Sequence, residues 1–353
     1  MSRKIRVLIV DDSALVRQLL AKGLGMDPEI EVVGTASDPY VARDKIVQLK
    51  PDVMTLDVEM PRMDGVDFLR RLMPQCPIPV LMVSSLTQRG KQITLDALDA
   101  GAVDFVAKPS TDLARGLASM LQDLRAKVKQ TSKANVSHWK NKQAVPSAPS
   151  SRAPQRALAE STDKVVAIGA STGGTEAIRQ LVTQFPVSMP GVVIVQHMPA
   201  GFTKMFADRL NQLCAMEVKE AENGDRVMPG RILVSPGGLH MRVIRSGGLY
   251  QVQCQAGENV SGHCPSVDVL MHSVAQHVGS NAVGVMLTGM GSDGAAGMLA
   301  MREAGARNLA QDEATSVVFG MPKVAYERGG AERLLPLDRI APAVIDLLSE
   351  RKS

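Results

Sequence analysis

The chain has 353 residues, 45% of them hydrophobic and 22% charged, which is ordinary for a soluble globular protein of about two domains. Aromatic residues make up only 3%, so the cores must consist of aliphatic side chains and methionine. We expect no membrane span and no signal peptide, since no apolar run is long enough to cross a bilayer. The four cysteines contain no C-x-x-C pair, which argues against a disulfide framework or zinc finger and favours a reducing cytoplasm.

The net charge of +4 is concentrated in one segment. Residues 125–160 hold eight Lys or Arg and one acidic residue, so they carry +7 and the remainder carries −3. The segment lacks a sustained apolar period and contains three prolines among Ser, Ala, Lys and Gln. We therefore predict a flexible basic linker at 125–160, between domains at 1–124 and 161–350, and no nucleic-acid surface.

The only tryptophan, Trp139, falls in this linker. Its position leaves three interpretations open: chance exposure, packing against a neighbouring domain, or docking of a partner.

The first domain alternates between apolar runs and helical patterns. We expect strands at 4–10, 30–36, 53–56, 79–83 and 102–106, and helices at 13–24 and 39–49. In the first helix, Leu15, Val16, Leu19 and Leu20 are expected to lie on one face. Alternating strands and helices predict a doubly wound, parallel, five-stranded sheet.

Polar residues follow the strands of this sheet, at the edge where open α/β sheets bind ligands. They are Asp11, Asp12, Asp57, Ser84 and Lys108. One such aspartate is commonly a helix or turn cap, but five such residues together indicate a site. Converging carboxylates repel one another unless a divalent cation lies among them, and oxygen ligands suit Mg²⁺. A nearby lysine can pair with a phosphoryl oxygen.

This set resembles the receiver domain of response regulators, which has a flavodoxin-like fold, over residues 4–124. The resemblance implies that Asp57 accepts a phosphoryl group from a partner histidine kinase. It also implies that Asp11, Asp12 and Asp57 hold Mg²⁺. Three further positions match the switch residues of the family: Ser84, Phe105 and Lys108.

A glycine-bracketed serine is the central feature of the second domain. The apolar run 165–168 predicts a buried strand, and residues 176–182 have helical spacing. Ser171 therefore lies on a tight strand-to-helix turn, where free backbone N–H groups can stabilise an oxyanion. Taken alone, the turn fits equally well a serine N-cap or a phosphate-binding loop.

A histidine and an acid follow two further strands. His197 comes almost directly after the run 191–195, with one residue between them, and Asp293 lies in a glycine-rich loop after the run 282–287. A serine, a histidine and an acid at three strand ends of one parallel sheet could form a hydrolytic triad. Their order along the chain differs from that of α/β-hydrolases, and no G-x-S-x-G motif is present.

Two other local features lie between these strands. Residues 231–234 and the Ser-Pro-Gly-Gly turn at 235–238 predict a short strand and a hairpin. Residues 265–270 predict the start of a helix, with Ser266 as its cap.

The second domain resembles the chemotaxis protein-glutamate methylesterases. Four segments carry the resemblance: GASTGG at 169–174, QHMP at 196–199, PSVDVL at 265–270 and LTGMGSDG at 287–294. The implied roles are nucleophile for Ser171, general base and acid for His197, and orienting carboxylate for Asp293. The oxyanion positions are Met290 and the residue beside the serine, Thr172. Cys264 departs from the basic residue expected there and leaves the electrostatics on the substrate side open.

The implied function is hydrolysis of γ-glutamyl methyl esters on chemoreceptors, with deamidation of receptor glutamines by the same chemistry. The resemblance implies Mg²⁺ for the receiver and no cofactor for the esterase reaction. We expect the unphosphorylated receiver to hinder access to Ser171, and phosphorylation of Asp57 to relieve this. Two alternatives are a receiver joined to a DNA-binding module, which needs a helix-turn-helix and a basic face, and an inert scaffold.

Overall fold

The computed structural model describes residues 3–60, 63–85, 87–108, 113–140 and 163–350, and it divides into units at 1–149 and 150–353. Each unit is a parallel α/β fold, as predicted, and each is described by itself. None of the helices in these ranges is long and apolar enough to cross a membrane.

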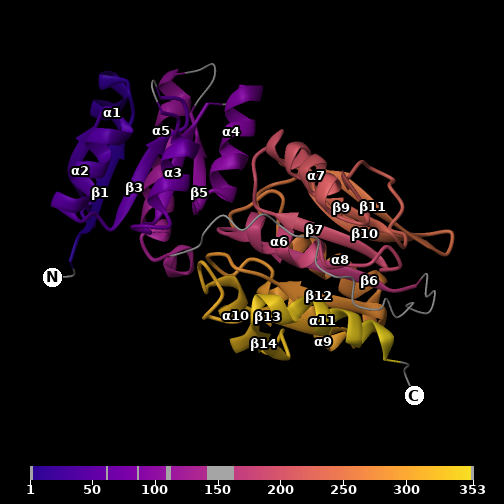
Figure 1. Ribbon diagram of the computed structural model, residues 1–353. Helices are drawn as coiled ribbons and strands as arrows, with labels where there is room; N and C mark the ends of the chain where they lie inside the picture. Colours follow the sequence, from indigo (N-terminus) through magenta and orange to yellow (C-terminus); the bar gives the residue numbers. More distant parts are fainter. Residues whose placement is uncertain (1–2, 61–62, 86, 109–112, 141–162, 351–353) are drawn as a thin grey trace. The chain divides into compact units, whose positions relative to one another are not determined.

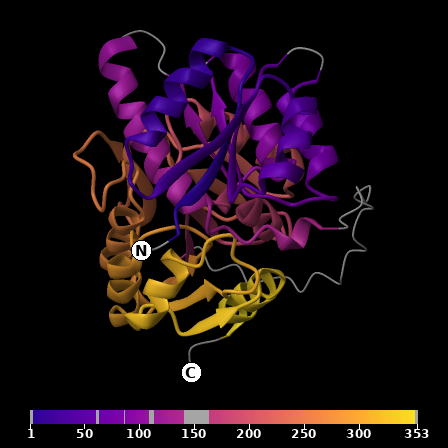
Figure 2. The ribbon, with the colours of Figure 1, turned by 90° about the vertical axis from the view of Figure 1, so that its left-hand side faces the viewer.

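The N-terminal unit contains a parallel five-stranded sheet in the order β2-β1-β3-β4-β5. Its strands are β1 (Ile5–Val10), β2 (Ile30–Ala36), β3 (Val53–Asp57), β4 (Val80–Ser84) and β5 (Asp104–Ala107). Its helices are α1 (Ala14–Gly25), α2 (Pro39–Leu49), α3 (Gly65–Leu72), α4 (Gln88–Asp99) and α5 (Leu113–Thr131). Helices flank the strands on both sides (Figures 1 and 2). The predicted doubly wound fold is thus confirmed.

Of the four residues expected on one face of α1, Leu15 does not join the core. Leu15 is 73% exposed, whereas Leu20 and Leu24 are fully buried against the sheet. At 100° per residue the buried stripe runs through Val16, Leu20 and Leu24, and Leu15 falls outside it on the first turn.

The last helix of the unit continues past residue 124. Leu124 and Val128 of α5 are both fully buried in the cluster that contains Leu20 of α1. A short 3₁₀ turn follows at Ser137–Trp139, and the Trp139 ring lies against Gly101. Trp139 thus packs within the N-terminal unit. The remainder of the expected linker, from residue 141, lies outside the described residues.

The C-terminal unit contains a seven-stranded sheet in the order β14-β13-β12-β6-β7-β9-β8, with every adjacent pair parallel. Its strands are β6 (Val165–Ala170), β7 (Gly191–Gln196), β8 (Glu217–Glu220), β9 (Arg231–Val234), β12 (Ala282–Met286), β13 (Arg307–Gln311) and β14 (Arg333–Leu335). Its helices are α6 (Gly174–Val182), α7 (Phe202–Leu213), α8 (Val267–His277), α9 (Ala295–Glu303), α10 (Met321–Glu327) and α11 (Leu337–Ser349), with a 3₁₀ turn, η2 (Gly279–Asn281).

The predicted hairpin lies elsewhere. Strand β9 sits between β7 and β8 in the main sheet, and the turn at 235–238 does not fold it back on a partner. The antiparallel hairpin forms from the next two strands, β10 (His240–Ser246) and β11 (Leu249–Gln255). Residues 231–234 and the turn formed a plausible hairpin in sequence, but the apolar β9 is instead buried as an inner strand.

The central strands β12, β6 and β7 are buried along their whole length. Successive side chains along a strand face opposite sides of the sheet. On one side, residues of α8, α9 and the β10–β11 hairpin form a cluster with Val165, Ala167, Val193 and Val195. Helix α11 contacts α6 as well as β12 and β13. Burial on both faces explains the continuous apolar runs and fixes the three strand ends that carry the site.

Candidate functional site

The three predicted site residues of the C-terminal unit come from three adjacent strands. Ala170 of β6 pairs with Gln196 of β7, so Ser171 and His197 are the next residues on neighbouring strands. The His197 N–H donates to the Ala170 carbonyl at 3.1 Å, which continues the strand pairing to the edge. Asp293 follows β12, on the other side of β6. The predicted convergence of three strand ends is therefore present in the backbone.

The serine turn is fixed by contacts with the loop that follows β12. The Ser171 N–H donates to the Thr288 carbonyl at 3.1 Å, and the Thr288 hydroxyl donates to the Thr172 carbonyl at 3.0 Å. Gly173 has a φ of +76°, and a Cβ there would lie 2.6 Å from the Val317 Cβ. This turn therefore requires glycine, both for its backbone conformation and for its packing.

The Ser171 N–H is not free, contrary to our expectation of free N–H groups on this turn. The oxyanion donors implied by the resemblance, Thr172 and Met290, do not depend on it. The loop bearing Met290 is pinned close to the serine, because Gly289 packs against Ser171 and its carbonyl accepts the Met321 N–H at 2.8 Å.

His197 and Asp293 form a direct pair. The Nε2 atom of His197 lies 2.7 Å from Oδ2 of Asp293, whose side chain is 1% exposed. Burial alone would raise the pKa of Asp293, but the hydrogen bond and charge of His197 hold that pKa below its usual value. Backbone N–H groups of α8 act in the same direction.

The start of α8 supplies three further hydrogen bonds to Asp293. Oδ1 accepts the Ser266 hydroxyl at 2.8 Å and the Asp268 N–H at 3.0 Å, and Oδ2 accepts the Val267 N–H at 2.8 Å. Ser266 is also the N-cap of α8, as predicted, since its hydroxyl accepts the Val269 N–H. A buried carboxylate at a helix N-terminus is stabilised in its ionised form.

The other ring nitrogen of His197, Nδ1, is available to accept a proton. With Nε2–H donating to the carboxylate, Nδ1 carries the lone pair. Nδ1 is buried and has no hydrogen-bond partner among the residues that the structure describes. The Ser171–His197 hydrogen bond is thus not formed in this state, and such bonds commonly shorten only when substrate is present.

Two supporting residues were missed by the sequence reasoning. The Gln196 amide donates to the carbonyls of Ser171 at 2.9 Å and His197 at 3.2 Å, so it joins the two site loops. His263 stacks on the His197 ring. Gln196 was visible only as part of a motif, and a stacked ring has no sequence signal. Cys264 contributes through its backbone, whose carbonyl accepts the Gly238 N–H at 3.3 Å.

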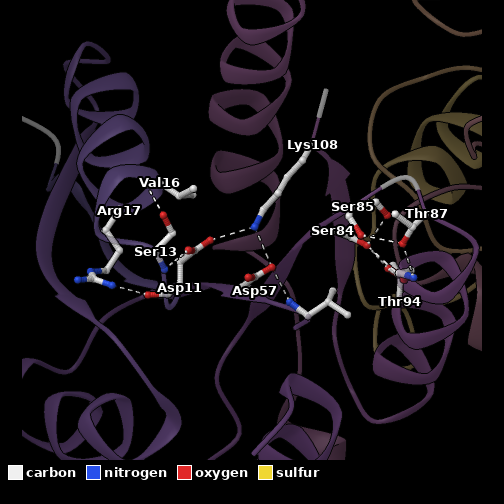
Figure 3. Close-up of polar contacts among 12 residues, drawn as sticks. Asp11, Ser13, Val16, Arg17, Asp57, Ser84, Ser85, Thr87, Thr94 and Lys108 are labelled. Carbon is white, nitrogen blue, oxygen red and sulfur yellow. Dashed lines mark hydrogen bonds and ion pairs between the residues drawn. The ribbon is translucent and has the colours of Figure 1, made fainter. Parts of the chain in front are cut away.

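The predicted acidic site of the N-terminal unit is assembled at the sheet edge (Figure 3). The Lys108 ammonium lies 2.9 Å from Oδ1 of Asp57 and 3.1 Å from Oδ2 of Asp11. Carboxylate oxygens of Asp11, Asp12 and Asp57 all lie within 4.8 Å of one another. This is an all-oxygen cluster with an exposed member, which suits a cation that keeps several waters.

Burial raises the pKa of Asp57 to about 6, although Lys108 lowers it, and the neighbouring Asp11 raises it further. Burial lowers the pKa of the Lys108 ammonium, but the Asp57 and Asp11 carboxylates outweigh this effect. The pKa of Lys108 is therefore above its usual value. One lysine therefore does not neutralise the cluster, and the donor set fits a divalent cation.

Of the predicted switch residues, Lys108 contacts Asp57, whereas Ser84 points away from it (Figure 3). The Ser84 hydroxyl lies among groups at the start of α4: it bonds the Gly90 carbonyl at 3.2 Å and the Thr94 hydroxyl (Figure 3). Phe105 is 3% exposed, so its ring is turned inward.

Comparison with known proteins gives a match for each unit. A family model described as CheB methylesterase matches residues 166–344, and one described as response regulator receiver domain matches residues 7–132. A protein named protein-glutamate methylesterase/protein-glutamine glutaminase from Syntrophotalea carbinolica is 75% identical over 352 residues, which is 100% of both chains. One of the same name from Sulfurimonas denitrificans is 57% identical over 99% of both chains.

A solved structure is also similar. The crystal structure of the Thermotoga maritima CheB methylesterase catalytic domain is 37% identical, with a TM-score of 0.52. It covers 53% of this chain and 100% of its own.

Proposed function

The chain belongs to the CheB methylesterase family, and we propose that it is a phosphorylation-regulated hydrolase that removes methyl esters from chemoreceptor glutamates in chemotaxis adaptation. We propose that it also deamidates receptor glutamines. The observation that carries this proposal is the buried His197–Asp293 pair beside Ser171, on three adjacent strand ends.

In the proposed reaction, the Ser171 Oγ attacks the ester carbonyl carbon and its proton passes to Nδ1 of His197. The Thr172 and Met290 N–H groups donate to the oxyanion of the tetrahedral intermediate. The intermediate collapses by breaking the bond to the methoxy oxygen, which takes the proton from His197 and leaves as methanol. Asp293 holds Nε2–H and stabilises the imidazolium formed between these steps.

Water then attacks the acyl-enzyme, and His197 takes one of its protons. The ester bond to Ser171 breaks, Oγ recovers the proton, and the product is a glutamate side chain. A glutamine substrate follows the same course with ammonia as the first leaving group.

In the receiver, an oxygen of Asp57 attacks the phosphorus of a phosphohistidine on the partner kinase, and the bond from phosphorus to the histidine nitrogen breaks. Mg²⁺ bound by Asp11, Asp12 and Asp57 would supply positive charge for the phosphoryl oxygens. Lys108 pairs with the phosphoryl group, and the Ser84 hydroxyl leaves the Gly90 carbonyl to reach it.

The proposed partners are methylated chemoreceptors and the chemotaxis histidine kinase, and the proposed location is the cytoplasm. Four free cysteines support a reducing compartment: Cys76, Cys214, Cys254 and Cys264.

Methanol release from methylated receptors tests the proposal. Ser171→Ala should reduce release by a factor of about 10⁴ or more, since the nucleophile is removed. Asp57→Asn should keep the basal rate and lose stimulation by acetyl phosphate. The exposed Ser349 and Asp44 provide matched controls, Ser349→Ala and Asp44→Asn, which should behave as wild type. Full activity of Ser171→Ala would favour the scaffold alternative instead.

A further inference from the structure

A second imidazole covers the face of the catalytic one. The rings of His197 and His263 are nearly parallel, with an interplanar angle of 15° and centroids 3.7 Å apart. This separation is van der Waals contact between ring faces. The His197 side chain is only 7% exposed, so the stacked ring forms part of its enclosure.

His263 is held on a tight turn between β11 and α8. The Val260 and His263 backbones exchange two hydrogen bonds of 3.0 Å, and the two residues between them have φ values of +53° and +85°. These residues are Ser261 and Gly262. A closed turn with two left-handed residues has few alternative conformations, so the ring is presented in a fixed place.

The same helix start anchors both this turn and the carboxylate of the site. The Ser261 hydroxyl donates to Oδ2 of Asp268 at 3.1 Å, and the Asp268 N–H donates to Asp293 at 3.0 Å. The Asp293 carboxylate and the His263 ring both contact the His197 ring. Both are thereby anchored to the same rigid element, the start of α8.

A single hydrogen bond at Nε2 leaves the His197 ring free to tilt about that bond, and tilting swings Nδ1 away from the serine. A ring stacked on its face removes this freedom. We propose that His263 is a positioning residue that fixes the plane of the His197 imidazole so that Nδ1 meets the Ser171 hydroxyl. This inference rests on the proposed hydrolase function.

Steady-state methanol release from methylated receptors by the full chain tests this role. His263→Ala should lower kcat roughly 10- to 100-fold with KM within about twofold, because misplacement affects proton transfer and not substrate binding. His263→Phe, which keeps a flat ring of similar reach, should restore kcat to within about threefold of wild type. The exposed His272 on α8 gives a matched control, His272→Ala, which should equal wild type.

Wild type and Ser171→Ala are measured beside these variants. If wild type releases no methanol, or Ser171→Ala retains full release, the proposed function fails. If both behave as expected, the His263 variants decide the inference alone. Should His263→Ala not fold, as judged by circular dichroism, His263→Phe carries the test.

Three outcomes would overturn the inference. Wild-type kcat in His263→Ala would mean that the stacked ring is not needed. A loss in His263→Phe as large as that in His263→Ala would mean that a flat ring does not suffice. A change confined to KM would assign His263 to substrate contact.

Discussion

Replacement of Asp293 by asparagine separates the charge of this side chain from its shape. Each carboxylate oxygen accepts two hydrogen bonds, and on each side one of the donors is a backbone N–H, from Val267 or Asp268. An amide NH₂ at either position therefore faces a donor that cannot reverse. Rotation of the amide only exchanges which backbone N–H loses its acceptor.

The expected cost has two parts. One unsatisfied buried N–H and the loss of charge-assisted bonds should lower the free energy of unfolding of the C-terminal unit by about 2 to 4 kcal/mol. The kcat for methanol release should fall by a factor of about 10³ to 10⁴, because an asparagine NH₂ facing His197 favours the wrong tautomer.

The two parts need separate assays. Trp139 belongs to the N-terminal unit, so its fluorescence does not report this region. Amide hydrogen exchange in α8 reports the local free energy, and methanol release reports kcat. Ser266→Ala gives a graded comparison, since it removes the helix cap and one bond to Asp293 but keeps the charge, for a loss of about 1 to 2 kcal/mol. Asp208→Asn, on the exposed face of α7, should change neither quantity.

The pH dependence gives an independent check. Asp293 has a lowered pKa in the folded state, so its contribution is present above the unfolded pKa of about 4 and is lost as the pH falls further. The difference in unfolding free energy between wild type and Asp293→Asn should therefore shrink below about pH 4. Unchanged α8 exchange in the variant at pH 7, with wild-type kcat, would refute the reasoning.

Three further predictions concern single groups. Without divalent cations, the Asp57 carboxyl should titrate near pH 6 and the N-terminal unit should lose stability as the pH rises through that value. Carboxyl ¹³C shifts measure this, Mg²⁺ should lower the midpoint, and a midpoint near 4 without it would contradict the assignment. Gln196→Met should reduce kcat more than it raises KM, because two site carbonyls lose their shared donor; unchanged kinetics would exclude that link. Gly173→Ala should destabilise by about 1 to 3 kcal/mol in denaturant unfolding, owing to its positive φ and contact with Val317; wild-type stability would contradict this.

Much of the fold follows from periodicity in the sequence. Apolar runs with polar residues at their ends identified the central strands. A strand that is buried on both faces is apolar at consecutive positions, so it stands out in the sequence. Short edge strands gave no such signal: β8 is Glu-Val-Lys-Glu, with one buried residue, and β14 has three residues. The expected hairpin failed because pairing partners depend on the whole sheet and not on the turn.

The site could be predicted as residue types at strand ends, and its supports could not. The positions of Ser171, His197 and Asp293 follow from where their strands stop. The contacts of Gln196 and His263 depend on side-chain directions set by distant packing, which spacing does not encode. The Ser171 N–H illustrates the same limit, since its acceptor Thr288 lies in the loop after another strand.

The spatial order of β12, β6 and β7 has a consequence for synthesis of the enzyme. The serine strand lies between a neighbour made soon after it and one made more than a hundred residues later, so the carboxylate arrives last. A nascent chain that ends before β12 contains Ser171 and His197. It lacks the loop that contacts Ser171 and the Asp293 carboxylate that binds His197. Hydrolytic competence is therefore withheld until the ribosome has delivered most of the domain.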